Sequence, residues 1–303
     1  LTKFTAEALP EVTLFAAEER EFTISDGRTV HGWLLSAPET SGAAPLLLDI
    51  HGGPHNAWTG VADTYHPAHQ VLAAQGWRIL TLNPRGSDGY GADFMYAVNG
   101  AWGTSDQADF LEPIDALVAE GLVDGDRLAI TGYSYGGYST CHLTSATDRF
   151  AAAVAGGLIC DFNAMAGVCD FGPHLASLAT VTTVPENSAG LLAASPLAAV
   201  KNVVTPTLIL HGKSDERCPL GQAEAWFAAL RQQHVPTRLV AYPGASHGFL
   251  VNGSISHRID YSTRLIEWVK RYTSAKLPKT GLANASAGAD AWKRSLDVLC
   301  ERY

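Results

Sequence analysis

Short apolar runs of β-strand length recur along this chain. Six of them have almost no polar interruption, which is typical of strands covered on both faces. They lie at residues 45–51, 78–83, 127–132, 150–157, 206–212 and 237–244. Residues 21–35 instead alternate polar and apolar side chains around a turn at Asp26 and Gly27. This alternation predicts a β-hairpin that opens the folded domain at about Glu21.

Helix-like segments separate the apolar runs. They lie at residues 66–76, 105–121, 220–233 and 258–272. Strands that alternate with helices predict βαβ units, and therefore a doubly wound, mostly parallel sheet with helices on both faces. Residues 160–199 break this rhythm, because they contain Pro173, Pro185 and Pro196 but no clean strand. We expect helices inserted over an edge of the sheet there.

Composition and charge exclude several classes of protein. The 303 residues are 47% hydrophobic and 17% charged, so the chain can bury a sizeable core. The formal net charge is -9 without a basic cluster, which argues against nucleic acid and anionic membranes as partners. No apolar run is long enough to cross a bilayer, and the first twenty residues lack the features of a signal peptide.

Cysteine and histidine spacing predicts neither a disulfide framework nor a metal site. The five cysteines are an odd number without CxxC spacing, which favours reduced thiols in a cytoplasmic protein. His51 and His55 flank a Gly-Pro loop rather than one face of a helix. His66 and His69 lie on an expected surface helix, without an acid or cysteine to complete a metal set. We expect no metal and no cofactor.

A glycine-flanked serine follows one of the predicted strands. Ser134 lies between Gly132 and Gly136, after the run at 127–132 and before helix-compatible residues. A G-x-S-x-G at such a junction is the nucleophile elbow of the α/β-hydrolase fold, in which glycines relieve crowding around a strained serine. The alternative is a glycine-rich turn with a serine that caps the helix.

Partners for this serine occur later in the chain, in the order that the fold requires. A serine hydroxyl needs a base to take its proton, and the base needs an orienting acid. Asp215 follows the run at 206–212, and His247 follows the run at 237–244. Each could instead be structural, Asp215 as an acid at a helix N-terminus and His247 as a turn histidine. Their positions after successive strands favour a Ser-Asp-His triad with Ser134.

An oxyanion hole requires two backbone N–H donors near the serine. The residue after the nucleophile, Tyr135, supplies one, and the loop after an early strand supplies the other. That loop contains Gly52 and Gly53 in "HGGPH", and Gly53 is the first choice because glycines let the backbone approach a substrate closely. The alternative is that this segment is simply a tight turn.

With these residues identified, the chain resembles the catalytic domain of the prolyl oligopeptidase family of serine peptidases, especially its acylaminoacyl peptidase branch. The likeness extends roughly over residues 11–272. The matching stretches are "HGGPH" (51–55), "NPRGSDGYG" (83–91), "GYSYGGY" (132–138), "CDFG" (169–172), "DERCP" (215–219) and "SHGF" (246–249).

The resemblance implies roles for these residues. Ser134, Asp215 and His247 would be nucleophile, orienting acid and base, while Gly53 and Tyr135 would donate to the oxyanion. The family's apolar substrate pocket would fall on the irregular segment. Its candidate lining residues are Leu158, Ile159, Phe162, Met165 and Phe171. Each of these could equally be an ordinary core residue.

The chain also departs from the family pattern. Members usually carry a β-propeller before the catalytic domain, but only residues 1–20 precede the hairpin, and they look like a linker out of a propeller. Because the chain begins without Met, a propeller could have been removed or could be a separate chain. We expect an α/β-hydrolase domain over 21–272 and a C-terminal extension of unknown role, 273–303, with a potential amphipathic helix near its end. The pocket segment lacks a tryptophan to stack on proline, which argues against strict post-proline cleavage.

Three functions are compatible with these motifs. The first is a serine peptidase that cleaves short peptides or acylated amino-acid substrates through an acyl-enzyme, as an oligopeptidase, aminopeptidase or acylaminoacyl peptidase. The second is a carboxylesterase or small-amide hydrolase that uses the same triad. The third is a non-catalytic interaction domain, although such domains usually lose the serine or the histidine. The sequence leaves the oligomeric state open, a homo-oligomer included.

Overall fold

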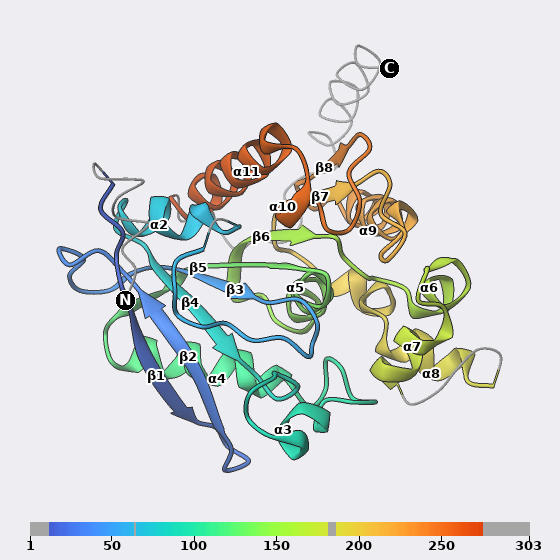
Figure 1. The fold of residues 1–303 in the computed structure, drawn as a ribbon, viewed down its shortest axis with the longest axis horizontal. Helices are drawn as coiled ribbons and strands as arrows, with labels where there is room; N and C mark the ends of the chain where they lie inside the picture. The colour runs from blue at the N-terminus through green and yellow to red at the C-terminus, as the bar shows by residue number, and fades with distance from the viewer. Residues whose placement is uncertain (1–11, 64, 181–185, 275–303) are drawn as a thin grey trace.

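One eight-stranded sheet forms the centre of the part of the chain that the computed structural model describes, residues 12–63, 65–180 and 186–274 (Figure 1). The strand order is β1-β2-β4-β3-β5-β6-β7-β8. The strands are β1 (Ala17–Thr23), β2 (Thr29–Leu35), β3 (Ala44–Ile50), β4 (Arg78–Asn83), β5 (Val123–Tyr133), β6 (Phe150–Gly156), β7 (Thr207–Gly212) and β8 (Thr237–Tyr242).

The sheet has the doubly wound, mostly parallel topology that the sequence predicts. β1 and β2 form the expected antiparallel hairpin, and β2 also pairs antiparallel with β4. The pairs from β4 through β8 are parallel. β1 begins at Ala17 rather than at the predicted Glu21, because Ala17 pairs with Leu35 at the end of β2. Register with β2, rather than the apolar pattern, therefore decides where the first strand starts.

Helices cover both faces of the sheet. α2 (Pro67–Ala73) and α11 (Ile255–Thr273) pack on one face, while α4 (Gln107–Ala119), α5 (Tyr135–Ala146) and α9 (Leu220–Gln232) pack on the other. In β7, Leu208 and Leu210 join the cluster under α11, and Ile209 between them joins the cluster under α5 and α9. The alternating side chains of a strand thus enter two different cores, which explains its continuous apolar run.

The irregular segment is helical, as predicted. It contains α6 (Phe162–Val168), α7 (Pro173–Thr180), α8 (Ser188–Ala194) and a 3₁₀-helix at Pro196–Asn202. α6 to α8 lie at one side of the molecule, beyond the carboxyl end of β6 (Figure 1). Asp161 caps α6 by accepting the N–H groups of Asn163 and Ala164. Short helices also occur at Ala92–Tyr96 (α3) and Phe249–Asn252 (α10).

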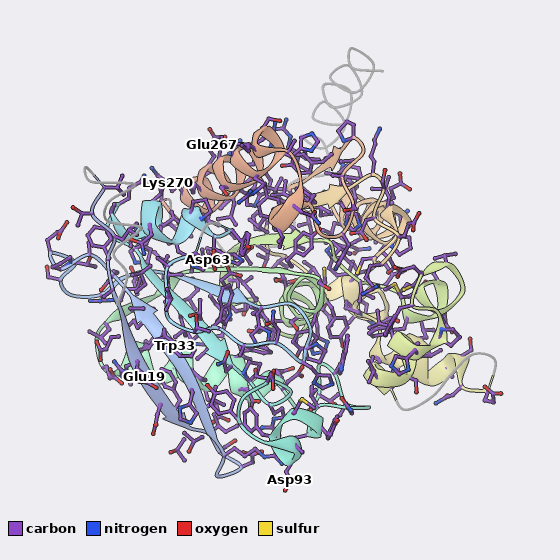
Figure 2. The ribbon with its side chains drawn as sticks, viewed as in Figure 1. Glu19, Trp33, Asp63, Asp93, Glu267 and Lys270 are labelled. Atoms are coloured by element: carbon purple, nitrogen blue, oxygen red, sulfur yellow. The ribbon has the colours of Figure 1, made fainter. Side chains whose placement is uncertain are left out.

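Glu19, Asp93 and Glu267 are among the exposed charged side chains at the periphery (Figure 2). None of the helices described has both the length and the apolar composition needed to cross a membrane. Residues 1–11 and 275–303 lie outside the described residues, and with them most of the predicted linker and nearly all of the predicted C-terminal extension. The predicted division of the chain into three segments stays a prediction.

Candidate active site

Ser134 occupies a strained turn between β5 and α5. Its φ of 62° and ψ of -117° lie outside the regions that non-glycine residues ordinarily adopt. Its N–H donates to the carbonyl of Gly156 at 3.0 Å, which ties the turn to β6. A Cβ on Gly132 would lie 2.5 Å from the carbonyl group of Gly136, and one on Gly136 would lie 2.0 Å from the carbonyl oxygen of Ile50. Both glycines are therefore required by close backbone approach, as an elbow at this position demands.

The three residues of the predicted triad meet at this turn. Asp215 follows β7 and His247 follows β8, and both loops leave the same end of the parallel sheet as Ser134. His247 Nε2 lies 3.0 Å from Ser134 Oγ, and its Nδ1 lies 2.7 Å from Asp215 Oδ2. Because an ionised carboxylate can only accept, Nδ1 carries the proton. The Nε2 lone pair then faces the serine hydroxyl.

The Asp215 carboxylate is completely buried and well supplied with donors. Its Oδ1 accepts the backbone N–H groups of Arg217 at 3.0 Å and Cys218 at 2.8 Å. His211, which is also buried, places Nε2 3.6 Å from Asp215 Oδ2 and donates to the carbonyl of Cys218 at 2.6 Å. Burial lowers the pKa of His211, so this ring stays neutral beside the carboxylate.

His211 is a residue that sequence reasoning missed. It lies in β7 among buried apolar residues, and nothing in its spacing distinguishes it from them. Its position beside Asp215 could have been inferred only from the i, i+4 separation in the turn after β7, which is a weak signal.

The two proposed oxyanion donors come from different segments next to Ser134. Tyr135 is the first residue of α5, and Gly53 lies in the loop after β3 with a φ of 126° that favours glycine. A Cβ on the neighbouring Gly52 would lie 3.4 Å from Ser134 Cβ, so this loop packs directly against the elbow. Within residues 12–63, 65–180 and 186–274, no acceptor takes the N–H of Gly53 or Tyr135. Both N–H groups are thus available to a substrate oxygen.

A buried histidine holds the Gly52–Gly53 loop. His51 Nδ1 lies 2.7 Å from the Gly52 carbonyl, and its Nε2 lies 3.0 Å from Ser87 Oγ. Burial lowers the pKa of His51 to about 4, so the ring is neutral at physiological pH and serves as a fixed hydrogen-bonding group.

The candidate pocket residues separate into two groups. Leu158, Ile159, Phe162 and Met165 are fully buried within the core clusters, whereas Phe171 is 45% exposed. The guanidinium carbon of Arg217 lies 4.9 Å from the centre of the Phe171 ring, and Arg217 Nε lies 2.6 Å from Asp170 Oδ1. In this structure Phe171 has the exposed surface that a substrate could touch. The lining of the pocket stays a prediction for all five residues.

The sequence analysis did not predict the ion pair between Asp170 and Arg217 beside Phe171. Both residues nevertheless lie in stretches that carry the family resemblance. The ion pair joins two loops that are 47 residues apart, one after α6 and one after β7. The backbone N–H of Asp170 also donates to the carbonyl of Glu216 at 2.8 Å, which reinforces the same junction. The opposite charges in "CDFG" and "DERCP" were the available signal, but their pairing requires the fold.

Metal-ligating side chains do not converge in the described part of the chain. No group of three or more His, Cys, Asp or Glu residues is placed there to hold an ion. The four described cysteines are free thiols, and Cys141, Cys160 and Cys218 are buried.

Comparison with known proteins assigns this arrangement to a family. The model of the prolyl oligopeptidase family matches residues 64–276. The chain is 38% identical over 275 residues to an uncharacterized peptidase, YuxL, of Bacillus subtilis, covering 90% of this chain and 41% of that protein. It is 33% identical over 213 residues to dipeptidyl aminopeptidase BIII of Pseudoxanthomonas mexicana, covering 68% of this chain and 30% of that enzyme.

Solved structures are similar as well. The acylaminoacyl peptidase of Pyrococcus horikoshii superposes with a TM-score of 0.84 and 26% sequence identity, covering 92% of this chain and 45% of that one. This likeness, together with the sheet topology, confirms the predicted α/β-hydrolase fold. The chain spans less than half the length of each of these three proteins.

Proposed function

The chain belongs to the prolyl oligopeptidase family, and on that basis we propose that it is a serine peptidase acting through Ser134, His247 and Asp215. The observation that carries the proposal is the continuous hydrogen-bonded path from Asp215 through His247 to Ser134, which ends on a strained turn. A serine held in this conformation beside a neutral imidazole is the arrangement that acyl transfer requires.

Acylation begins when His247 Nε2 takes the proton of Ser134 Oγ, across 3.0 Å. The oxygen attacks the substrate carbonyl, and the N–H groups of Gly53 and Tyr135 donate hydrogen bonds to the carbonyl oxygen as negative charge develops on it. Asp215 keeps the imidazole in the correct tautomer and stabilises the imidazolium. His247 then returns the proton to the leaving amine, and the C–N bond breaks to leave an acyl-enzyme.

Deacylation uses the same groups in reverse. Water donates a proton to His247 Nε2 and attacks the acyl carbon, and the same two N–H groups donate hydrogen bonds to the second oxyanion. Collapse of this intermediate releases the carboxylic acid and returns the proton to Ser134. No group outside the triad and the two donors has to change its protonation state.

Short peptides and acylated amino acids are the substrates that we propose. The relatives are named as an uncharacterized peptidase, a dipeptidyl aminopeptidase and an acylaminoacyl peptidase. The exposed Phe171 ring offers an apolar contact beside the loop that carries Asp215. An oligopeptidase, aminopeptidase or acylaminoacyl peptidase would each fit this contact.

A panel of substrates tests the proposal. Aminoacyl p-nitroanilides with and without an N-acetyl group, together with matched p-nitrophenyl esters, should be hydrolysed by the wild-type chain. Ser134→Ala should lower kcat by roughly 10⁴- to 10⁶-fold, with a residual rate from the oxyanion donors and substrate binding. A fluorophosphonate should label wild type at Ser134 and leave Ser134→Ala unlabelled.

Ser139→Ala is the matched control for this experiment. Ser139 lies on α5 as well, but its hydroxyl donates to the helix carbonyl of Tyr135 at 2.9 Å. This variant should be labelled at the wild-type rate. Hydrolysis of esters with every amide left intact would replace the peptidase by a carboxylesterase or small-amide hydrolase, and absence of labelling would reject the triad.

Partners and location stay predictions. A β-propeller as an upstream domain or separate chain, a homo-oligomer and a cytoplasmic location all follow from the sequence or the resemblance. Light scattering of the purified chain, alone and with candidate partner chains, would measure the first two.

A further inference from the structure

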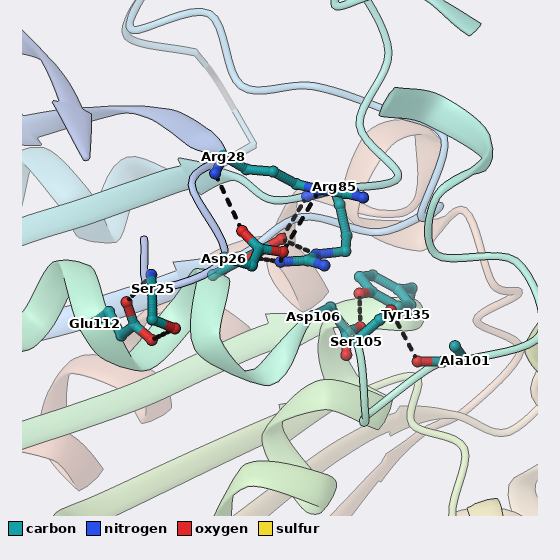
Figure 3. A network of polar contacts seen from close by, with 10 residues as sticks. Ser25, Asp26, Arg28, Arg85, Ala101, Ser105, Asp106, Glu112 and Tyr135 are labelled. Carbon is teal, nitrogen blue, oxygen red and sulfur yellow. Dashed lines mark hydrogen bonds and ion pairs between the residues drawn. The ribbon is translucent and has the colours of Figure 1, made fainter. Parts of the chain in front are cut away.

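A buried acid lies behind one of the two proposed oxyanion donors. The main chain of Tyr135 adjoins Ser134, but its side chain runs into the core, where the hydroxyl donates to Asp106 Oδ2 (Figure 3). Tyr135 and Asp106 are each 1% exposed. Asp106 comes from the start of α4, so this hydrogen bond joins the elbow to a different helix.

Asp106 has few partners for a buried carboxyl group. Its Oδ1 lacks a hydrogen-bond partner in the described part of the chain. The titratable groups that face it are Tyr135, Tyr138 and His142 from α5 and Asp109 from α4, and Asp109 is itself bound by Arg85.

The protonation of Asp106 sets the strength of its hydrogen bond with Tyr135. Burial raises the pKa of Asp106 to about 6, and the hydrogen bond from Tyr135 works in the opposite direction. Burial also raises the pKa of Tyr135 well above its ordinary value, so the phenol remains the donor. Above about pH 6 the bond is therefore charge-assisted, and below it the bond becomes a weaker one between neutral groups.

The segment before Asp106 also contacts the inserted helices. The N–H of Gly100 donates to the carbonyl of Leu178 at 2.7 Å, and the N–H of Trp102 donates to that of Ala179 at 3.3 Å, both in α7. The Trp102 ring meets the Tyr135 ring edge-on, with centroids 4.9 Å apart. The Tyr135 side chain is thus clamped between Trp102 and Asp106.

We propose that Asp106 is a positioning residue, whose ionised carboxylate holds the Tyr135 side chain and so aims the Tyr135 N–H at the oxyanion. This inference rests on the proposed function, because it requires the Tyr135 N–H to be a donor in acyl transfer. Tyr135 begins α5 and follows Ser134 directly, so a displaced side chain would shift the donor as well. Small errors of placement at a reacting centre cost a large part of the rate.

The proposal predicts that the effect of Asp106→Asn depends on pH. The hydrogen bond to Tyr135 is strongest when Asp106 is ionised, so wild type should lose this contribution to its labelling rate as the pH falls through about 6. Asp106→Asn cannot ionise, so the ratio of the wild-type rate to the variant rate should be largest at pH 8 and smaller at pH 5. A residue that only supports folding would give the same ratio at both pH values.

The experiment measures the second-order rate of fluorophosphonate labelling from pH 5 to 8, with a thermal melt of every variant. Asp106→Asn and Tyr135→Phe should react about 10-fold more slowly at pH 8, a fraction of the ~10²–10³ that complete loss of an oxyanion donor costs. With a p-nitroanilide substrate, kcat should fall while KM changes little. Asp106→Asn should melt no lower than wild type at pH 8, because the variant removes a buried charge.

Tyr138→Phe is the matched control. Tyr138 is buried on α5 too, but its hydroxyl donates to the carbonyls of Trp102 and Ala194, each at 3.1 Å, and not to Asp106. Its labelling rate should stay within about twofold of wild type, since no donor is displaced.

The outcomes separate this inference from the proposed function. An unlabelled wild type overturns the proposed function and the inference with it. With a labelled wild type, the inference alone is overturned if Asp106→Asn reacts at the wild-type rate, or if the ratio of the two rates is the same at pH 5 and pH 8. The inference would also be overturned if Asp106→Asn, Tyr135→Phe and Tyr138→Phe lost equal amounts of rate and of melting temperature. Such a result would show that Asp106 contributes to the stability of the fold and not to the position of the donor.

Discussion

Two buried aspartates are linked to the Ser134 turn, Asp215 through His247 and Asp106 through the side chain of Tyr135, and their partners differ. On the histidine side, Asp215 binds His247 through Oδ2 and accepts two backbone N–H groups through Oδ1. On the helix side, Asp106 accepts one phenol through Oδ2, and its Oδ1 is unpartnered within the described residues. Both side chains are removed from water, so burial does not distinguish them.

The contrast shows that the donors around a carboxylate decide what it can do. N–H donors compensate a buried negative charge, so Asp215 can serve as a fixed anion beside the imidazole. At Asp106 burial outweighs the hydrogen bonds from the Tyr135 hydroxyl and from backbone N–H groups, and it raises the pKa of this carboxyl group to about 6. One acid is suited to hold a charge during catalysis, and the other to respond to pH.

Among the aspartates of this molecule, the largest effect should come from removing the charge of Asp215. Asp215→Asn should lower kcat about 10⁴-fold, because an amide can donate to Nδ1 and so favours the wrong tautomer of His247. Turnover of a p-nitroanilide at pH 8 measures this loss. Glu216→Gln, at the exposed neighbouring acid, is the control and should keep wild-type kcat. Near-normal turnover in Asp215→Asn would remove Asp215 from the triad.

An intermediate effect should appear in the pH dependence of stability. The pKa of Asp106 is raised in the folded state, so its contribution to stability is complete below about pH 4 and is lost as pH rises through about 6. Asp106→Asn has no ionisable group at this position, so its stability does not decrease in this way as the pH rises. Between pH 5 and 8 the free energy of unfolding of the variant should therefore gain on wild type by about 1–2 kcal/mol.

Urea unfolding at the two pH values measures this difference between the variant and wild type. His142 lies near Asp106, and burial lowers its pKa. Its protonation would reduce the free energy of unfolding as the pH falls, whereas protonation of Asp106 increases it, so the sign of the change separates the two groups. A difference between variant and wild type that is the same at both pH values would contradict the raised pKa of Asp106.

The smallest effect should come from an exposed aspartate. Hydrogen bonds from Arg217 lower the pKa of Asp170, but both side chains are about 40% exposed. Asp170→Asn should therefore change the free energy of unfolding by less than about 1 kcal/mol. Urea unfolding measures the change. A loss above about 2 kcal/mol would show that this junction between the loops carries more than a surface ion pair.

Much of this geometry could be predicted from local patterns. Strands 206–212 and 237–244 are continuous apolar runs, and the residues that follow a buried parallel strand must leave at its carboxyl end. Asp215 and His247 could therefore be placed near Ser134 before the fold was known. The start of β1 was predicted at Glu21 but lies at Ala17, because the pairing of Ala17 with Leu35 depends on a second strand.

The pocket and the buried pair could not be predicted in this way. Phe162 and Phe171 are both aromatic and lie in one irregular segment, yet one is completely buried and the other 45% exposed. Asp106 and Tyr135 are 29 residues apart on different helices. No periodicity links such positions, because their contact depends on how α4 and α5 pack on the sheet.

The amino-acid sequence alone determines the strands, their alternation with helices, the elbow glycines and the order of the candidate catalytic residues. These features follow from local hydrophobic pattern and backbone sterics, which act over a few residues. Tertiary structure alone decides that Asp215 meets N–H donors and Asp106 meets a phenol. The reason is that the charge of a buried group depends on its neighbours in space, and those neighbours come from distant parts of the chain.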